Sequence, residues 1–285
     1  MPAPAPPPVY PDEPTIPILP NMLTAGNLLC GFFSILTIFK GMAYDPGTPE
    51  AFEHYRQATY FIFAACVFDL LDGRVARLCK ADGPFGREFD SIADVVSFGI
   101  APAMLLARAV LFRLPVPFLG DGIAVLYLLC AALRLARFNC MAAAPRKPNQ
   151  SSDFVGLPVP MAAGAVVSAM YLVIDITTNR NLFIPQAWQI AMAGAMTVVS
   201  LLMMSRVIYP SFKHITFRKR GTITAMLLAI AAVCALICFP WIAPALIFLC
   251  YLLYGLIVRP FLTRNMRRTL EVANEDDDSE DDTEG

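Results

Sequence analysis

The sequence is poor in charged residues and in histidine. Charged residues make up 16% of its 285 residues and hydrophobic residues 57%, whereas a soluble domain has roughly 25% charged residues. Only two histidines are present, His54 and His214. The eight cysteines form no C-x-x-C pair and lie within or next to apolar runs. This composition argues against a soluble domain, a histidine-ligated metal centre, a zinc site and a disulfide framework.

The first 20 residues contain no lysine or arginine. A secretory signal needs a basic segment before its apolar core, so residues 1–20 do not resemble one. Nine prolines lie in this stretch, and they favour an extended, disordered head.

The other end of the chain is strongly acidic. Nine of the 23 acidic residues lie between Glu271 and Glu284, and without them the formal net charge of −1 becomes +8. We expect the acidic end to be a solvated, disordered tail. The basic remainder suits an anionic lipid surface and phosphorylated substrates.

The chain is rich in apolar runs of about 20 residues, the length at which a helix crosses a bilayer. We therefore expect an all-α integral membrane protein with about eight transmembrane helices. The expected spans are 22–39, 58–78, 89–112, 122–143, 158–176, 185–204, 222–239 and 243–258. Polar loops are expected at 40–57 and 144–157, and a basic loop at 205–221.

This pattern divides the chain into four parts. We expect a proline-rich head at 1–20, a six-helix catalytic core at 21–205, and an acidic tail at 263–285. Between core and tail, 206–262 holds the basic loop and two helices, which the short turn from Pro240 to Pro244 joins into an antiparallel hairpin.

Lysine and arginine are unevenly divided between the two sides of the expected bundle. Eight spans place both termini on one side, and 17 basic residues fall on that side against five on the other. The positive-inside rule then predicts cytoplasmic termini. The loop that joins the second and third spans is on the same side. The expected location is a bacterial inner (plasma) membrane.

Four aspartates interrupt the apolar pattern near that loop. A carboxylate inside a bilayer-length segment costs roughly 2.5–3.5 kcal/mol, so its default interpretation is functional. Asp69 and Asp72 are three residues apart at the end of the second span, and Asp90 and Asp94 are four apart at the start of the third. Each pair shares one helix face. Because a short loop makes the helices antiparallel neighbours, we expect the four carboxylates to meet.

Such a cluster predicts a metal site. Four carboxylates repel one another, and hard divalent cations relieve that repulsion. Mg²⁺ or Mn²⁺ suits an all-carboxylate set completed by phosphate oxygens, and two ions would suit a displacement at phosphorus. Gly73 and Ala76 leave room for a ligand, Gly86 lets the backbone turn, and Arg77 suits a pyrophosphate. Alternatively, the aspartates only end two spans and pair with the nearby arginines.

The stretch is similar to the signature of the CDP-alcohol phosphotransferases, D-x2-D-G-x2-A-R-x8-G-x3-D-x3-D. Its eight fixed positions are all present, as Asp69, Asp72, Gly73, Ala76, Arg77, Gly86, Asp90 and Asp94. The resemblance implies a membrane enzyme, usually a homodimer, that transfers a phosphoalcohol group from a CDP-linked donor to a hydroxyl.

The resemblance also implies roles for these residues. Asp69, Asp72 and Asp90 would bind metal, and Asp94 would be a metal-site carboxylate that also acts as general base. The remaining four would border the cytidine and pyrophosphate, with Arg77 near the phosphates.

Three further segments resemble the branch of this family that makes phosphatidylserine. They are LPNMLTAGN at 19–27, RLARFN at 134–139 and FVGLPVP at 154–160. This resemblance implies transfer from CDP-diacylglycerol to L-serine, with release of CMP. Asn21 and Thr24 would contact the donor or cap the first helix. The residues that would hold the serine carboxylate or a donor phosphate, or would instead reach lipid headgroups, are Arg134, Arg137 and Asn139.

The acceptor and the function class have alternatives. Glycerol 3-phosphate or an inositol phosphate would need a phosphate pocket, which Arg134, Arg137 and the basic cluster 213–220 could supply. A cation transporter would place carboxylates near mid-membrane on several helices, whereas these bracket one loop. A scaffold without activity is disfavoured because the signature is complete. Nucleic acid is not an expected partner.

Overall fold

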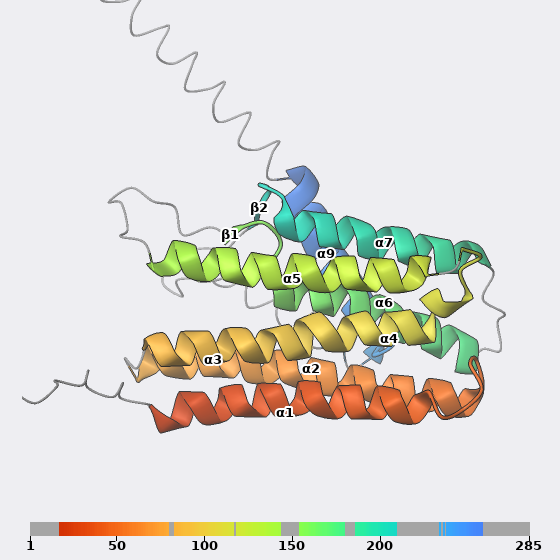
Figure 1. The fold of residues 1–285 in the computed structure, drawn as a ribbon, viewed down its shortest axis with the longest axis horizontal. Coiled ribbons are helices and arrows are strands. Elements are labelled where there is room, and N and C mark those ends of the chain that lie inside the picture. The colour runs from red at the N-terminus through yellow and green to blue at the C-terminus, as the bar shows by residue number, and fades with distance from the viewer. Residues whose placement is uncertain are drawn as a thin grey trace, which may run out of the picture.

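A computed structural model describes residues 17–79, 83–116, 118–143, 154–179, 186–209, 234, 236 and 238–258. These residues form a bundle of long helices that run side by side (Figure 1). Almost all of the expected head and the whole of the expected tail lie outside the described residues.

The first two helices form an antiparallel pair. α1 (Ile18–Gly41) packs along α2 (Pro49–Leu78). The hydroxyl of Thr48 caps α2 by accepting a hydrogen bond from the backbone N–H of Ala51, and proline occupies the first helical position. Both features are typical helix starts. The polar loop expected at 40–57 is therefore wrong in its second half, because the helix begins before the apolar run does.

The third long helix changes character immediately after Asp94. α3 (Pro84–Asp94) passes into a π-helical turn, η1 (Val95–Ile100), and then into α4 (Ala101–Ala109). A π-helical turn inside an α-helix shifts the faces that its neighbours see and often marks a functional site. The short 3₁₀ turn η2 (Leu111–Arg113) follows.

Further helices of the described residues build the other half of the bundle. They are α5 (Leu119–Ala143), α6 (Val159–Asn179), α7 (Gln186–Met204) and α9 (Ala243–Leu253), which continues into the π-helical turn η4 (Tyr254–Val258). α5 packs on α7, while α6 contacts both α2 and α9. Two short strands, β1 (Phe154–Val155) and β2 (Ile208–Tyr209), pair antiparallel at the bundle end where α5 and α7 finish (Figure 1).

The predicted fold class, all-α integral membrane protein, is confirmed. Five described helices are long and apolar enough to cross a membrane, namely Ile18–Gly41, Pro84–Ala109, Leu119–Met141, Val159–Thr178 and Ala187–Met204. They correspond to five of the expected spans. α2, which contains the second expected span, carries several charges in its last turns. Most of 222–239 lies outside the described residues, and 243–258 is a shorter apolar helix. The number of eight spans stays a prediction.

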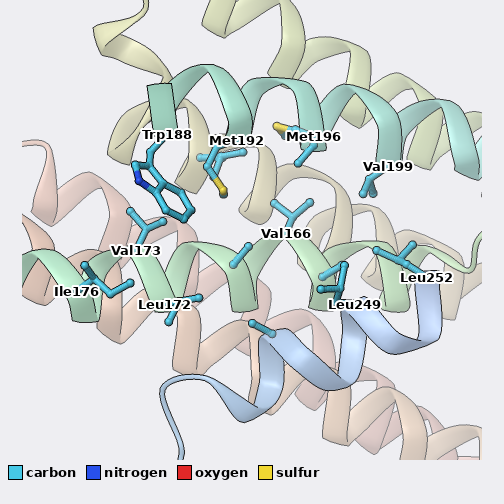
Figure 2. A pocket seen from close by; sticks show the side chains of 15 residues that line it. Val166, Leu172, Val173, Ile176, Trp188, Met192, Met196, Val199, Leu249 and Leu252 are labelled. Atoms are coloured by element: carbon cyan, nitrogen blue, oxygen red, sulfur yellow. The ribbon is translucent and has the colours of Figure 1, made fainter. Parts of the chain in front are cut away.

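An apolar cavity lies between α6, α7 and α9. It has a volume of about 570 Å³. Figure 2 shows Val166 and Val173 of α6, Trp188 and Met196 of α7, and Leu249 of α9 around it. Aliphatic and aromatic side chains therefore line the space between these three helices.

Candidate active site

Three of the four aspartates meet where α2 ends and α3 begins. Asp69 and Asp72 lie in the last turns of α2, and Asp90 lies on α3. One carboxylate oxygen from each lies within 4.8 Å of the other two. Residues three apart share a helix face, so the spacing of the α2 pair turns both carboxylates toward α3. The structure thus brings together three of the four predicted metal ligands.

Asp94 lies one helical turn beyond this group, at the end of α3. It is not among the three clustered residues, but it interacts electrostatically with all of them. Its side chain is buried, with 5% of the residue exposed. The predicted base is therefore next to the predicted metal ligands but distinct from them in position.

The first helix supplies a hydrogen-bond donor to each part of the site. The hydroxyl of Thr24 donates to Oδ2 of Asp72 over 2.8 Å, and Nδ2 of Asn27 donates to Oδ1 of Asp94 over 3.2 Å. Thr24 and Asn27 are three residues apart and so share a face of α1.

Sequence reasoning gave Asn27 no role in the site. Two features of the sequence nevertheless point to a role for Asn27. Asn27 is a polar residue inside an apolar span, and it lies one turn after Thr24, which was singled out for the donor site.

Unpartnered polar atoms at the same place test whether the site fits a metal and a phosphate ligand. Among the described residues, Oδ1 of Asp90 and Nδ2 of Asn21 are buried and have no hydrogen-bond partner. A buried polar atom without a partner costs about 1–3 kcal/mol. A divalent cation would satisfy the carboxylate oxygen, and an all-oxygen donor set is what Mg²⁺ and Mn²⁺ prefer. The residues present therefore fit the predicted metal.

The small residues of the signature leave space beside the carboxylates. A Cβ atom added to Gly73 would meet only Nη1 of Arg77, at 3.8 Å. A Cβ added to Gly86 would lie 3.4 Å from Oδ1 of Asn21, so Asn21 borders the start of α3. Ala76 is half-buried and Arg77 is exposed at the end of α2. All the predicted nucleotide-site residues thus lie near the same end of the bundle.

Of the three predicted acceptor residues of α5, Asn139 contacts α3 and Arg137 contacts the turn after β1. Asn139 donates to Oγ of Ser91 over 2.9 Å, and Ser91 follows Asp90 on α3, so Asn139 lies against α3 beside the clustered carboxylates. Arg137 lies against the turn that follows β1, where a Cβ on Gly156 would come within 3.0 Å of its Nη2. Gly156 has a φ of +82°, a conformation that favours glycine.

Arg134 is the buried member of this set, with 6% of the residue exposed. Its guanidinium lies 5.6 Å from the centroid of the Phe138 ring, and it interacts electrostatically with Asp94. A buried arginine next to a carboxylate site is suited to an anionic ligand.

Three relatives of the chain share one enzyme name. The chain is 29% identical over 245 residues to the CDP-diacylglycerol--serine O-phosphatidyltransferase of Helicobacter pylori strain J99, which covers 86% of this chain and 92% of that protein. It is 32% identical over 195 residues to the Bacillus subtilis protein of the same name, covering 68% of this chain and 91% of that protein. The yeast protein of that name is 38% identical over 157 residues, covering 54% of this chain and 53% of the yeast chain.

A family model provides the broader assignment. The model for CDP-alcohol phosphatidyltransferase matches residues 17–199. This range runs from the start of α1 into α7 and contains all four aspartates and their α1 partners. The match covers more than half of the chain and agrees with the signature and with the clustered carboxylates. The chain belongs to the CDP-alcohol phosphatidyltransferase family.

Proposed function

We propose that this protein transfers the phosphatidyl group of CDP-diacylglycerol to L-serine, giving phosphatidylserine and CMP. The observation that carries the proposal is the meeting of Asp69, Asp72 and Asp90, with Asp94 one turn away. The names of the Helicobacter and Bacillus relatives support serine as the acceptor.

The carboxylates would hold the divalent ions, Mg²⁺ or Mn²⁺, and two ions is the number that we propose. Asp69, Asp72 and Asp90 are the ligands, and Asp94 completes the site. Bound there, the ions would neutralise the charge of the pyrophosphate. Gly73, Ala76 and Gly86 leave room for the cytidine and pyrophosphate, with Asn21, Thr24 and Arg77 nearby.

The transfer itself is a displacement at phosphorus. The serine hydroxyl oxygen attacks the phosphorus that bears diacylglycerol, and a new P–O bond forms. The bond from that phosphorus to the CMP oxygen breaks, and CMP leaves with the electron pair. Asp94 accepts the hydroxyl proton as general base. Its contact with Asn27 leaves its second carboxylate oxygen for this role.

The acceptor would bind between α3, α5 and the turn after β1. Arg134 and Arg137 are suited to the serine carboxylate, because a guanidinium pairs with a carboxylate through two parallel hydrogen bonds. The same arginines would also suit the phosphate of glycerol 3-phosphate or of an inositol phosphate, which is why the acceptor needs a direct test.

The protein would work as a homodimer with its active site and both termini on the cytoplasmic side of a bacterial inner membrane. The distribution of 17 basic residues against five supports this orientation. CDP-linked donors carry a water-soluble nucleotide head, which suits a site at the end of the bundle (Figure 1).

The test is an acceptor panel. Purified protein receives CDP-diacylglycerol and Mn²⁺ or Mg²⁺, with L-serine, glycerol 3-phosphate or an inositol phosphate, and CMP release is measured. We expect release with L-serine alone. Release with glycerol 3-phosphate but not with serine would contradict the proposed acceptor and leave the reaction class intact. An absence of release with every acceptor would contradict the proposed function as a whole.

A further inference from the structure

A buried asparagine on α1 contacts the proposed base. Asn27 has none of its surface exposed, and its Nδ2 donates to Oδ1 of Asp94 over 3.2 Å. The neighbouring helices leave both side chains almost no contact with solvent, since Asp94 is 5% exposed. Hydrogen bonds to a buried carboxylate are strong and directional. This contact therefore fixes where the carboxylate of Asp94 points.

Asn27 is itself held from the opposite helix. The hydroxyl of Ser97, in the π-helical turn after Asp94, donates to the main-chain oxygen of Asn27 over 2.9 Å. Gly31, one turn further along α1, permits this approach, because a Cβ at that position would lie 2.7 Å from the Cα of Ser97. Two hydrogen bonds thus join the helices at Asn27. Asn27 donates one to Asp94 and accepts the other from Ser97.

The orientation of the Asn27 amide suits a base. Its N–H group faces Asp94, while its Oδ1 atom is buried without a partner among the described residues. The amide N–H donates to Oδ1 of Asp94, and this leaves Oδ2 as the oxygen that can receive a proton. The reverse orientation would set two acceptor oxygens against each other.

We propose that Asn27 is a positioning residue for the reaction, which holds the Asp94 carboxylate in the orientation that receives the proton of the acceptor hydroxyl. The inference rests on the proposed function and adds to it a residue outside the family signature. Asn27 does not contact the three clustered metal ligands by any hydrogen bond that the described residues show. Its neighbour Thr24 has that contact, through Asp72.

The proposal separates turnover from binding. Loss of the Asn27 donor should lower kcat by about 10²-fold, the lower end of what a positioned base contributes. The KM values for L-serine and CDP-diacylglycerol should change by less than about threefold, because the residue acts through Asp94 rather than on either substrate. The affinity for Mn²⁺ should change far less than kcat does, because Asp69, Asp72 and Asp90, the three clustered ligands, keep their own contacts.

Two substitutions at Asn27 remove the amide donor while keeping the number of side-chain heavy atoms. Asn27→Leu supplies no polar atom, and Asn27→Asp sets a second carboxylate against Asp94. Asn27→Gln keeps an amide donor, and we expect it to retain at least a tenth of the wild-type kcat. Ser97→Ala leaves Asn27 in place but removes its main-chain contact, so it should lower kcat by about threefold to tenfold. This milder change keeps the proposal testable if the Asn27 variants fold poorly.

The matched control is Ser34→Ala. Ser34 is also fully buried on α1, and its hydroxyl donates across to the main-chain oxygen of Ala58 on α2 over 3.0 Å. Its removal breaks an interhelical hydrogen bond of the same kind, away from the aspartates. We expect kcat within twofold of wild type.

The measurements are kcat and KM from CMP release and Mn²⁺ binding by electron paramagnetic resonance. A lower kcat for Asn27→Leu and Asn27→Asp, with recovery in Asn27→Gln and a change in the Mn²⁺ affinity of Asn27→Leu far smaller than its loss of kcat, supports the inference. A wild-type kcat in Asn27→Leu would overturn it while leaving the proposed function intact. A loss of Mn²⁺ affinity that parallels the loss of kcat would also overturn it, since Asn27 would then act on the metal site. Wild-type protein that releases no CMP with any acceptor would overturn both.

Discussion

The α1–α2–α3 half of the bundle and the α6–α7–α9 half are joined by different kinds of contact. In the first half, polar side chains of α1 bond across to neighbouring helices, from Thr24 to Asp72 and from Asn27 to Asp94. In the second half, the hydroxyls of Ser168, Thr197 and Ser200 bond back to carbonyls of their own helices. Apolar side chains and a cavity of about 570 Å³ lie between those helices.

The two kinds of contact have different consequences: hydrogen bonds orient individual side chains, whereas apolar contacts hold whole helices together. Polar groups are expensive inside a membrane protein, so interhelical hydrogen bonds concentrate where a side chain must be held in one direction. Apolar contacts between α6, α7 and α9 hold helices together without fixing the direction of any one side chain (Figure 2). We infer that loss of the polar contacts in the first half affects turnover before stability, and that changes to the apolar contacts in the second half affect stability first.

The largest effect is expected from loss of a clustered carboxylate. Asp72→Asn keeps the shape of a side chain that is buried and bonded to Thr24, but it removes the charge that would bind a cation. Metal ions supply several kcal/mol in such displacements, so CMP release should fall by about 10³-fold. Asp121→Asn, at an exposed residue at the start of α5, is the control and should keep normal activity. Near-normal release by Asp72→Asn would remove the basis for a metal site here.

A smaller effect on metal binding is expected from loss of Thr24, which contacts a proposed metal ligand but is not one itself. Thr24→Val keeps the shape of the side chain and removes the hydroxyl that lies 2.8 Å from Asp72. Groups that orient metal ligands typically contribute 10–100-fold to metal affinity or activity, and we expect a weakening of Mn²⁺ binding in that range. Thr37→Val is the matched change on the same helix, because the hydroxyl of Thr37 bonds only to the carbonyl of Phe33 among the contacts described. Equal affinity in both variants would contradict an orienting role for Thr24.

The close approach of α1 to the π-helical turn predicts a change in stability. Gly31→Ala places a methyl group against Ser97 and should lower the free energy of unfolding by about 1–3 kcal/mol through overpacking. Gly194→Ala on α7 meets no atom within 4 Å and should be neutral or stabilising, since alanine favours helix by up to about 1 kcal/mol. Thermal unfolding in detergent compares the two. Equal midpoints would show that the helices can separate at Gly31 without cost.

The smallest effect is expected in the apolar half. Ala169→Leu adds apolar atoms to the cavity between α6, α7 and α9. Because a filled cavity restores lost contacts, we expect stabilisation of about 1 kcal/mol or less and CMP release within twofold of wild type. A large loss of release without loss of stability would mean that the cavity takes part in the reaction, and the separation of the two halves would then be wrong.

The sequence predicted the parts of the site that depend on local spacing. The i, i+3 pair of Asp69 and Asp72 and a short loop were enough to place these carboxylates against Asp90. The start of α2 was missed because Thr48 and Pro49 mark a helix through capping, whereas the expected boundary followed hydropathy alone. Hydropathy shows where the apolar run begins, whereas capping shows where the helix begins, and in α2 these two positions differ.

The contacts that sequence reasoning missed depend on tertiary structure. Asn27 meets Asp94 across 67 positions of the chain, and neither local spacing nor composition indicates that pairing. The pairing of Phe154 with Tyr209 likewise joins distant segments of the chain. Each of them is a long-range contact that only the folded chain defines.

The central claim is that the clustered aspartates bind the metal on which transfer to serine depends. It is tested most directly by titrating Mn²⁺ into metal-stripped wild-type protein and Asp90→Asn while measuring bound Mn²⁺ and serine-dependent CMP release together. We predict that release in the wild type rises in step with Mn²⁺ bound, is abolished by EDTA, and is lost with Mn²⁺ binding in Asp90→Asn. Full release by EDTA-treated protein, or normal Mn²⁺ binding and release by Asp90→Asn, would contradict the account.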